Sequence, residues 1–277
     1  MDDEWAAWVG RSQTVAEDIW APRVAQLAAT LDLAPAPGEG DPLPPGWQWL
    51  FFNPAAPQSA LGEDGHPRRG GFLPPIELPR RMWAGSRLTY HAPLPIGAPA
   101  EKHSEIISID RKAGRSGTLV FVTLRHTTSQ GSVIAIEEEQ DLVYRGHPLP
   151  GDSAPQGKPA PRAQWSEPVR PDAPLLFRYS ALTFNGHRIH YDTPYATGVE
   201  GYPALVVHGP LTATLLQGFA SRLQPGQRLA SFTFRGLAPL FVDRTLHLEA
   251  AESDRGLSLW VRNERGEMAM QASATFG

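Results

Sequence analysis

Residues 184–192 read Phe-Asn-Gly-His-Arg-Ile-His-Tyr-Asp, and residues 204–210 read Ala-Leu-Val-Val-His-Gly-Pro. The first segment gathers several proton-handling side chains, and the second leads into a glycine at the expected start of an apolar helix. Neutral imidazole is the side chain best suited to moving a proton near neutral pH, and an amide can hold a water molecule without titrating. The two segments together predict an active site.

Gly209 is expected to begin that helix. The first backbone N–H groups of a helix have no partner within it and lie at the positive end of its dipole, so they suit a developing oxyanion. His187 and His190 lie three residues apart, a spacing that could suit a metal pair. Zinc sites, however, need a third and a fourth ligand, and the chain has no cysteine. We therefore expect no metal site.

Both segments resemble the signature of the MaoC-like, (R)-specific enoyl-CoA hydratases of the hotdog fold, which reads Asp-x-Asn-Pro-hydrophobic-His-x-Asp and later His-Gly. On this chain the resemblance implies that His190 is the catalytic histidine, Asp192 its trailing acid and Gly209 the amide of the oxyanion hole. Asp192 could equally cap a turn through residues 193–194. The family's catalytic aspartate falls on Asn185, which leaves one titrating group fewer.

The altered motif resembles that of a subfamily, the fumaryl-type and mesaconyl-CoA hydratases related to mitochondrial 3-hydroxyacyl-thioester dehydratase. The local form in that subfamily is Asn-x-His-x-Ile-His-x-Asp. A second motif carries the same resemblance, at residues 71–75 (Gly-Phe-Leu-Pro-Pro) and 78–85 (Leu-Pro-Arg-Arg-Met-Trp-Ala-Gly). The resemblance covers nearly the whole chain, and two separate motifs argue against a chance match.

Four further residues are candidates with more than one interpretation. His187 either orients Asn185 or simply packs against its neighbours. His208 is expected to be structural, because the backbone of the next residue forms the oxyanion hole. Arg80 and Arg81 are candidates for binding the substrate, although paired charges are more often solvated or salt-bridged.

The resemblance implies the reversible addition of water to the 2,3 double bond of an acyl-CoA thioester. Gly209 N–H is expected to polarise the thioester carbonyl, His190 to handle the proton of the attacking water, and Asn185 to hold that water in line. Whether His190 acts alone or with Asp192 stays open. No cofactor is expected, since CoA is part of the substrate.

The subfamily implies a short branched or dicarboxylic acyl group of the mesaconyl-, 3-methylfumaryl- or itaconyl-CoA type, with a citramalyl-type product. A substrate carboxylate calls for a cation, and Arg178 and Arg188 flank the motif closely. Three alternatives stay open: an (R)-3-hydroxyacyl-thioester dehydratase of fatty-acid metabolism, a hotdog acyl-CoA thioesterase, and a non-catalytic acyl-CoA-binding subunit. The missing aspartate is the best argument for the last of these.

Composition is that of a globular enzyme. The chain has 277 residues, of which 41% are hydrophobic, so it can bury a large core. A net charge of −4 gives no basic surface for nucleic acid. The acidic start lacks the features of a secretory signal, and no apolar run is long enough to span a bilayer. We expect a cytoplasmic protein without membrane or nucleic-acid partners, and the sequence leaves a homodimer open.

Hydrophobic periodicity predicts the secondary structure. A helix is expected within Thr14–Leu31, where Pro22 breaks or starts it, and another over Leu211–Leu223. Residues 34–46 are rich in proline and glycine and predict a loop. Strands are expected at 86–91, 101–110, 118–128 and 132–144 in the first half, and at 228–237, 244–253, 258–263 and 268–276 in the second.

Two short matches indicate an internal duplication: residues 117–122 resemble 256–261, and 92–94 resemble 238–240. With the family resemblance, this implies an α+β tandem (double) hotdog in which each antiparallel sheet wraps around a central helix. We expect a degenerate hotdog domain with a helical N-terminal extension over 1–146, a proline-rich linker over 147–174 and a catalytic MaoC-like domain over 175–277. Only the second half carries the polar motif, and the family resemblance implies that the first half shapes the acyl and CoA groove.

Overall fold

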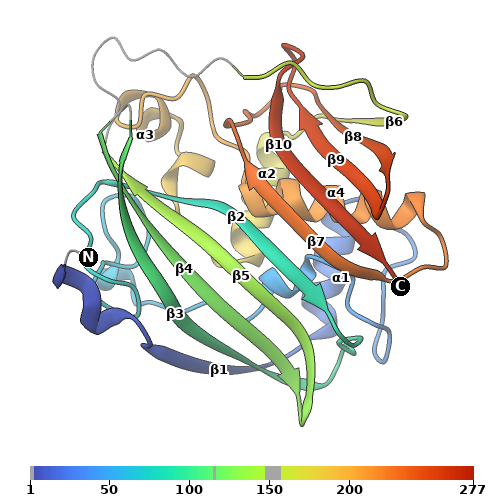
Figure 1. The fold of residues 1–277 in the computed structure, drawn as a ribbon, viewed down its shortest axis with the longest axis horizontal. Helices are drawn as coiled ribbons and strands as arrows, with labels where there is room; N and C mark the ends of the chain where they lie inside the picture. Colours follow the sequence, from blue (N-terminus) through green and yellow to red (C-terminus); the bar gives the residue numbers. More distant parts are fainter. Residues whose placement is uncertain (1–2, 115–116, 147–156) are drawn as a thin grey trace.

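Ten strands form one antiparallel sheet in the computed structural model of the chain, which describes residues 3–114, 117–146 and 157–277 (Figure 1). The strand order is β1-β3-β4-β5-β2-β7-β10-β9-β8-β6. The strands are β1 (Ser12–Asp18), β2 (Arg80–Tyr90), β3 (Pro99–Gly114), β4 (Gly117–Gln130), β5 (Val133–Arg145), β6 (Trp165–Val169), β7 (Leu229–Gly236), β8 (Leu246–Ser253), β9 (Gly256–Arg262) and β10 (Met268–Phe276). The helices are η1 (Asp3–Trp8), α1 (Ala21–Thr30), η2 (Trp47–Leu50), η3 (Gln58–Ala60), α2 (Ala173–Leu182), η4 (Arg188–His190), α3 (Thr193–Gly198) and α4 (Gly209–Leu223).

The strand order repeats when it is followed inwards from either edge. β1 and β6 are the two edges, followed by β3 and β8, β4 and β9, β5 and β10, with β2 and β7 in the centre. β2 and β7 pair over Gly85–Thr89, where a Cβ on Gly85 would collide with the backbone oxygen of Phe234. The expected duplication is thereby confirmed, the two antiparallel sheets join edge to edge, and the expected strands of both halves are present.

The second half buries a long helix against its sheet. α4 packs on β7, β8 and β9 and lies across this sheet in Figure 1. Its buried stripe includes Leu211, Leu216 and Phe219, and Pro210 stands in the first turn, where a missing N–H costs nothing. Truncation of one such buried side chain to alanine removes about 2–5 kcal/mol of stability. The expected helix is confirmed, and it begins two residues earlier than the apolar pattern.

The first half has the short η2 at the equivalent place in the chain, and α1 packs on α2 instead. Polar contacts hold this region to the first sheet. Trp49 Nε1 donates to buried Glu138 (3.0 Å), which also accepts from Ser86 Oγ (2.6 Å). Glu17 accepts from the backbone N–H of Phe52 (2.5 Å). The two sheets therefore differ in how their concave faces are filled.

Two expectations from the sequence need correction. The segment 12–18 is not helical: it forms edge strand β1 on β3, and the helix starts at Ala21 with Pro22 in its first turn. Pairing with a neighbouring strand outweighed the local helical spacing, as tertiary context often does. Within the expected linker, residues 165–169 form β6 on β8, and Asp172 caps α2. Residues 147–156 of the linker lie outside the described residues, and the division into three segments stays a prediction.

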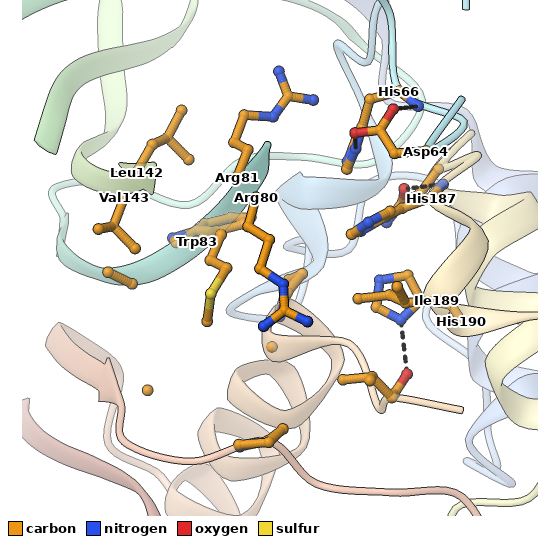
Figure 2. Close-up of a pocket in the computed structure, with 18 of the residues that line it drawn as sticks. Asp64, His66, Arg80, Arg81, Trp83, Leu142, Val143, His187, Ile189 and His190 are labelled. Carbon is orange, nitrogen blue, oxygen red and sulfur yellow. Dashed lines mark hydrogen bonds and ion pairs between the residues drawn. The ribbon is translucent and has the colours of Figure 1, made fainter. Parts of the chain in front are cut away.

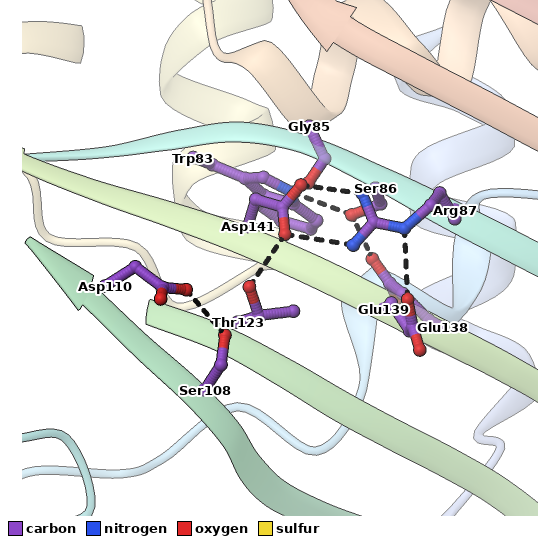
Figure 3. A network of polar contacts seen from close by, with 10 residues as sticks. All are labelled: Trp83, Gly85, Ser86, Arg87, Ser108, Asp110, Thr123, Glu138, Glu139 and Asp141. Carbon is purple, nitrogen blue, oxygen red and sulfur yellow. Dashed lines mark hydrogen bonds and ion pairs between the residues drawn. The ribbon is translucent and has the colours of Figure 1, made fainter. Parts of the chain in front are cut away.

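Charged side chains help to hold the register of the first sheet. Arg87 on β2 donates to Asp141 (2.7 Å) and Glu139 (3.1 Å) on β5, and Thr123 on β4 donates to Asp141 (3.1 Å) (Figure 3). Opposite charges on adjacent strands stabilise one register over a slipped one.

Among the described residues, no helix combines the length and apolarity that crossing a membrane requires.

Candidate active site

The predicted motif lines a cavity of about 2830 Å³ between the two halves. Its walls come from the loop 61–69, the start of β2, the segment 184–191 and the start of α4. Figure 2 shows Arg80, Arg81 and Trp83 on one side and His66, His187 and His190 on the other. Cavities of this kind, with a few convergent polar groups, are the usual place for a small-molecule site.

His190 is buried at the end of η4 and has a fixed tautomer. Its Nδ1 lies 2.7 Å from the backbone oxygen of Val206. A carbonyl oxygen can only accept, so Nδ1 carries the proton and Nε2 keeps a lone pair. Burial lowers the pKa of His190 to about 4, despite the opposing hydrogen bond to Val206. The ring is therefore a neutral base at physiological pH.

His208 holds the ring of His190 in place. The two rings stack with centroids 3.6 Å apart and planes 19° from parallel. His208 itself is fully buried, and its Nε2 lies 2.8 Å from Ser180 Oγ. Burial keeps the pKa of His208 well below its usual value, so two neutral rings can stack without repulsion. This position agrees with the structural role expected for His208.

Asn185 and His187 form the next part of the wall. Asn185 Oδ1 accepts from the backbone N–H of His187 (3.0 Å), which leaves the Nδ2 group of this cavity-lining amide for other partners. The ring of His187 stands perpendicular to that of His190, with centroids 5.4 Å apart. Burial, with the charges of neighbouring groups, lowers the pKa of His187 to about 2. Asn185, His187 and His190 are thus brought together as expected.

Gly209 starts α4 beside these side chains. A Cβ added here would meet no atom within 4 Å, so the backbone is open on the cavity side. His208, the preceding cap residue, makes no capping hydrogen bond from its side chain. The first N–H groups of a helix lack intrahelical partners. This geometry suits the expected oxyanion hole.

Asp192 lies outside the cavity lining and caps α3. Its carboxylate accepts from the backbone N–H of Tyr195 (3.1 Å) and from Arg188 (2.7 Å). Arg188 also donates to the backbone oxygen of Glu63 (3.0 Å). The prediction of a catalytic Asp192 is therefore not supported by its position, because capping and ion pairing occupy the side chain. Arg188 borders the cavity, but its guanidinium is already engaged.

The remaining arginines are placed differently from one another. Arg178 is exposed on α2 and does not line the cavity, so its expected role in carboxylate binding is not supported. Arg80 and Arg81 are consecutive on β2 and project in opposite directions (Figure 2). Arg80 is buried and salt-bridged to Glu200 (2.7 Å), as the more common interpretation of a charged pair anticipates. Arg81 borders the cavity without an ion pair to any described carboxylate.

Sequence reasoning missed two polar residues of the first half, Asp64 and His66. The imidazole of His66 lies 3.1 Å from the Asp64 carboxylate, and its ring centroid is 4.1 Å from that of His187. A Cβ on Gly65 would collide with the backbone oxygen of Gly186, so this loop sits directly on the motif. A histidine and an aspartate in a loop rich in glycine and proline were the available signal. The polar site is therefore shared by both halves.

Comparison with known proteins agrees with this geometry. The family model for hydroxyacyl-thioester dehydratase type 2 matches residues 46–242. The chain is 47% identical to the mesaconyl-C(4)-CoA hydratase of Chloroflexus aurantiacus over 277 residues, which is 99% of this chain and 98% of that protein.

Solved structures support the fold. A MaoC-like dehydratase from Phytophthora capsici superposes with a TM-score of 0.71 at 14% identity, over 99% of this chain and 98% of the other. A double-hotdog protein from Mycobacterium tuberculosis superposes with a TM-score of 0.54 at 15% identity, over 97% and 96% of the two chains. The chain therefore belongs to the hydroxyacyl-thioester dehydratase type 2 family and is a hydro-lyase with the double hotdog fold.

Proposed function

We propose that this protein hydrates a dicarboxylic enoyl-CoA of the mesaconyl-C4-CoA type. The observation that carries the proposal is the meeting of a neutral His190, with Nε2 free to accept a proton, and the open N-terminus of α4 at Gly209. His190 accepts a proton, and the Gly209 N–H stabilises the negative charge that develops on the thioester oxygen. These are the two requirements of conjugate addition of water. The 47% identity to a mesaconyl-C(4)-CoA hydratase supports the choice of acyl group.

The hydration uses these groups in two successive steps. The water oxygen bonds to the β-carbon while the π electrons move towards the thioester carbonyl, and His190 Nε2 takes a proton from the water. Gly209 N–H stabilises the resulting enolate oxygen. The proton is then delivered to the α-carbon, which gives a 3-hydroxyacyl thioester. Asn185 Nδ2 holds the water, since its Oδ1 is bonded to the backbone of His187. The reverse sequence is a dehydration.

A panel of thioesters tests the proposal. Mesaconyl-C4-CoA, crotonyl-CoA and 3-methylcrotonyl-CoA are followed by loss of enoyl-thioester absorbance, and the products by mass. The expected result is addition of one water, with the highest kcat/KM for the dicarboxylic thioester. Preference for crotonyl-CoA would contradict the substrate, and release of free CoA, detected by a thiol reagent, would contradict the reaction.

A further inference from the structure

We propose that Arg81 and His187 form a subsite that binds the free carboxylate of the acyl group, with His66 holding His187 in position. This inference rests on the proposed function and names its specificity determinant. Arg81 comes from the first half of the molecule and His187 from the second. The subsite would thus exist only where the two hotdog halves meet.

Arg81 is a cation without a counter-ion. It is only partly exposed, it borders the cavity, and it makes no ion pair with any carboxylate in the described ranges. By contrast, Arg188 forms a salt bridge with Asp192, and Arg80 forms one with Glu200. A guanidinium that lacks a counter-ion in a partly desolvated wall is costly unless an anion reaches it. Arg81 therefore suits the carboxylate of a ligand.

Arg81, His66 and His187 line the same cavity (Figure 2). After burial, the positive charge of Arg81 is among the causes that lower the pKa of His66, and it contributes likewise for His187. Arg69 acts on His66 in the same direction, and its guanidinium is held by the backbone oxygens of Ile76 (2.5 Å) and Pro79 (2.7 Å). Among the charged groups that act on His66, two arginines stand beside the single carboxylate of Asp64, which favours an anionic ligand there.

The chemistry of the acyl group requires the subsite to lie next to His190. In mesaconyl-C4-CoA the free carboxylate is bonded to the β-carbon, the atom that accepts water. A carboxylate one bond away from that carbon must contact a neighbour of the catalytic base. His187, with its ring 5.4 Å from that of His190 and no hydrogen bond to its ring nitrogens among the described residues, is in that position. His66 packs on its other side at 4.1 Å.

A divalent cation is the competing ligand for this cluster. Single donor atoms of Asp64, His66 and His187 lie within 4.8 Å of one another, and these are zinc-binding side chains. The positive charges of Arg81 and Arg69 argue against a cation, however, because they would repel a metal ion and attract an anion.

The test replaces Arg81 by methionine and compares two isosteric thioesters. Mesaconyl-C4-CoA and 3-methylcrotonyl-CoA differ only in the carboxylate, which is a methyl group in the second. R81M should lose about a hundredfold or more in kcat/KM for the first and less than about threefold for the second. The control R125M, at an exposed arginine on β4 away from the cavity, should change neither.

Binding of saturated analogues separates this inference from the proposed function. Calorimetry with 3-methylsuccinyl-CoA and isovaleryl-CoA needs no turnover, so it remains decisive if wild type hydrates neither enoyl thioester. Wild type should bind the dicarboxylic analogue more tightly, and R81M should abolish that preference with an unchanged melting temperature. Equal losses for both analogues in R81M, no loss, or a stoichiometric Zn²⁺ requirement for binding would each overturn the subsite. Rescue of the preference in R81K would support it.

Discussion

The two halves of this molecule share a sheet and differ in what they add to it. Both arrange their strands in the same order from the edge to the central β2–β7 pair. The second half adds α4, with Gly209 open at its start, and the histidine motif. The first half has η2 at the equivalent position and adds a loop that bears His66. Duplication of the sheet therefore did not duplicate the site.

The difference indicates a division of labour. Groups proposed to do the chemistry, His190 and Gly209, belong to the second half, whereas the unpaired Arg81 belongs to the first. A proton acceptor and an oxyanion hole serve any enoyl thioester, and a cation serves only an acidic one. Loss of His190 or of the Gly209 oxyanion hole should thus affect every substrate, and loss of Arg81 should depend on the substrate.

The largest effect is expected for His190→Ala. Removal of the base should lower kcat by about a thousandfold or more for all enoyl thioesters tested, because proton transfer and water positioning share this side chain. The matched control is His91→Ala, at an exposed histidine of the first half that lies outside the cavity. Steady-state kinetics and circular dichroism provide the measurement. A folded His190→Ala enzyme with normal kcat would remove the catalytic assignment.

Asn185 should give the next largest effect and tests the departure from the family motif. Asn185→Ala removes both the acceptor for the His187 N–H and the amide proposed to hold water, so we expect a loss of about a hundredfold in kcat. Asn185→Asp keeps the acceptor and should retain measurable activity. Activity is measured with the same thioester panel. A dead aspartate variant beside a healthy alanine variant would show that Asn185 is not part of the chemistry.

Gly65→Ala tests the contact between the halves. Gly65 has φ +85°, and a Cβ would collide with the backbone oxygen of Gly186, so the loop that bears His66 must move away. We expect about a tenfold loss in kcat/KM for the dicarboxylic thioester and a loss of roughly 1–3 kcal/mol in stability.

Gly70→Ala is the control for backbone strain alone. Gly70 has φ +89° but only an ordinary contact, at 3.8 Å from Pro75. The Gly70→Ala variant should lose about 1 kcal/mol of stability through backbone strain alone and keep its activity. Equal activity in the two variants would show that the loop need not touch the motif, and denaturant melts with kinetics decide this.

Local patterns predicted those elements whose stability is mainly local or periodic. The apolar spacing over 211–223 and the alternation in the strands marked α4 and the sheet. β1 was missed because its pairing with β3 is a long-range contact that overrides local spacing. The same holds for the site. His190, Asn185 and Gly209 lie in one motif, whereas His66 reaches it only through the contact of Gly65 with Gly186.

Two ion pairs at the site differ in how far the sequence predicts them. Arg188 and Asp192 are four residues apart, a spacing at which opposite charges pair when the segment is helical, and the structure shows this pair at 2.7 Å. That pair engages both Arg188, which was expected to bind the substrate carboxylate, and Asp192, which was expected to assist His190. Which of Arg80 and Arg81 is neutralised could not be predicted, because Glu200 lies far away in the chain.

The smallest expected effect is the response of wild-type activity to mild acid. Burial lowers the pKa of His190 to about 4, so its active neutral form should persist until the pH approaches that value. An ordinary imidazole of pKa about 6.5 would be only about one-tenth neutral at pH 5.5. We therefore expect kcat/KM to change by less than about threefold between pH 8 and 5.5.

Acid should lower the free energy of unfolding through these histidines, whereas a salt-bridged histidine would stabilise the fold in acid. His190 and His126, a buried first-half histidine whose pKa burial lowers to about 3, both resist protonation when folded, whereas the unfolded chain takes up protons near pH 6.5. The free energy of unfolding should therefore be highest above pH 6.5 and fall as the pH drops towards 4.

Initial rates after brief exposure to each pH, with denaturant melts at the same pH, separate the effect on activity from the effect on stability. His126→Gln should flatten the stability curve and leave the rate profile unchanged, because this ring lies outside the cavity lining. A tenfold loss of kcat/KM by pH 5.5 in enzyme that is still folded would show that the base titrates normally and is more exposed to water than its position in the second half indicates.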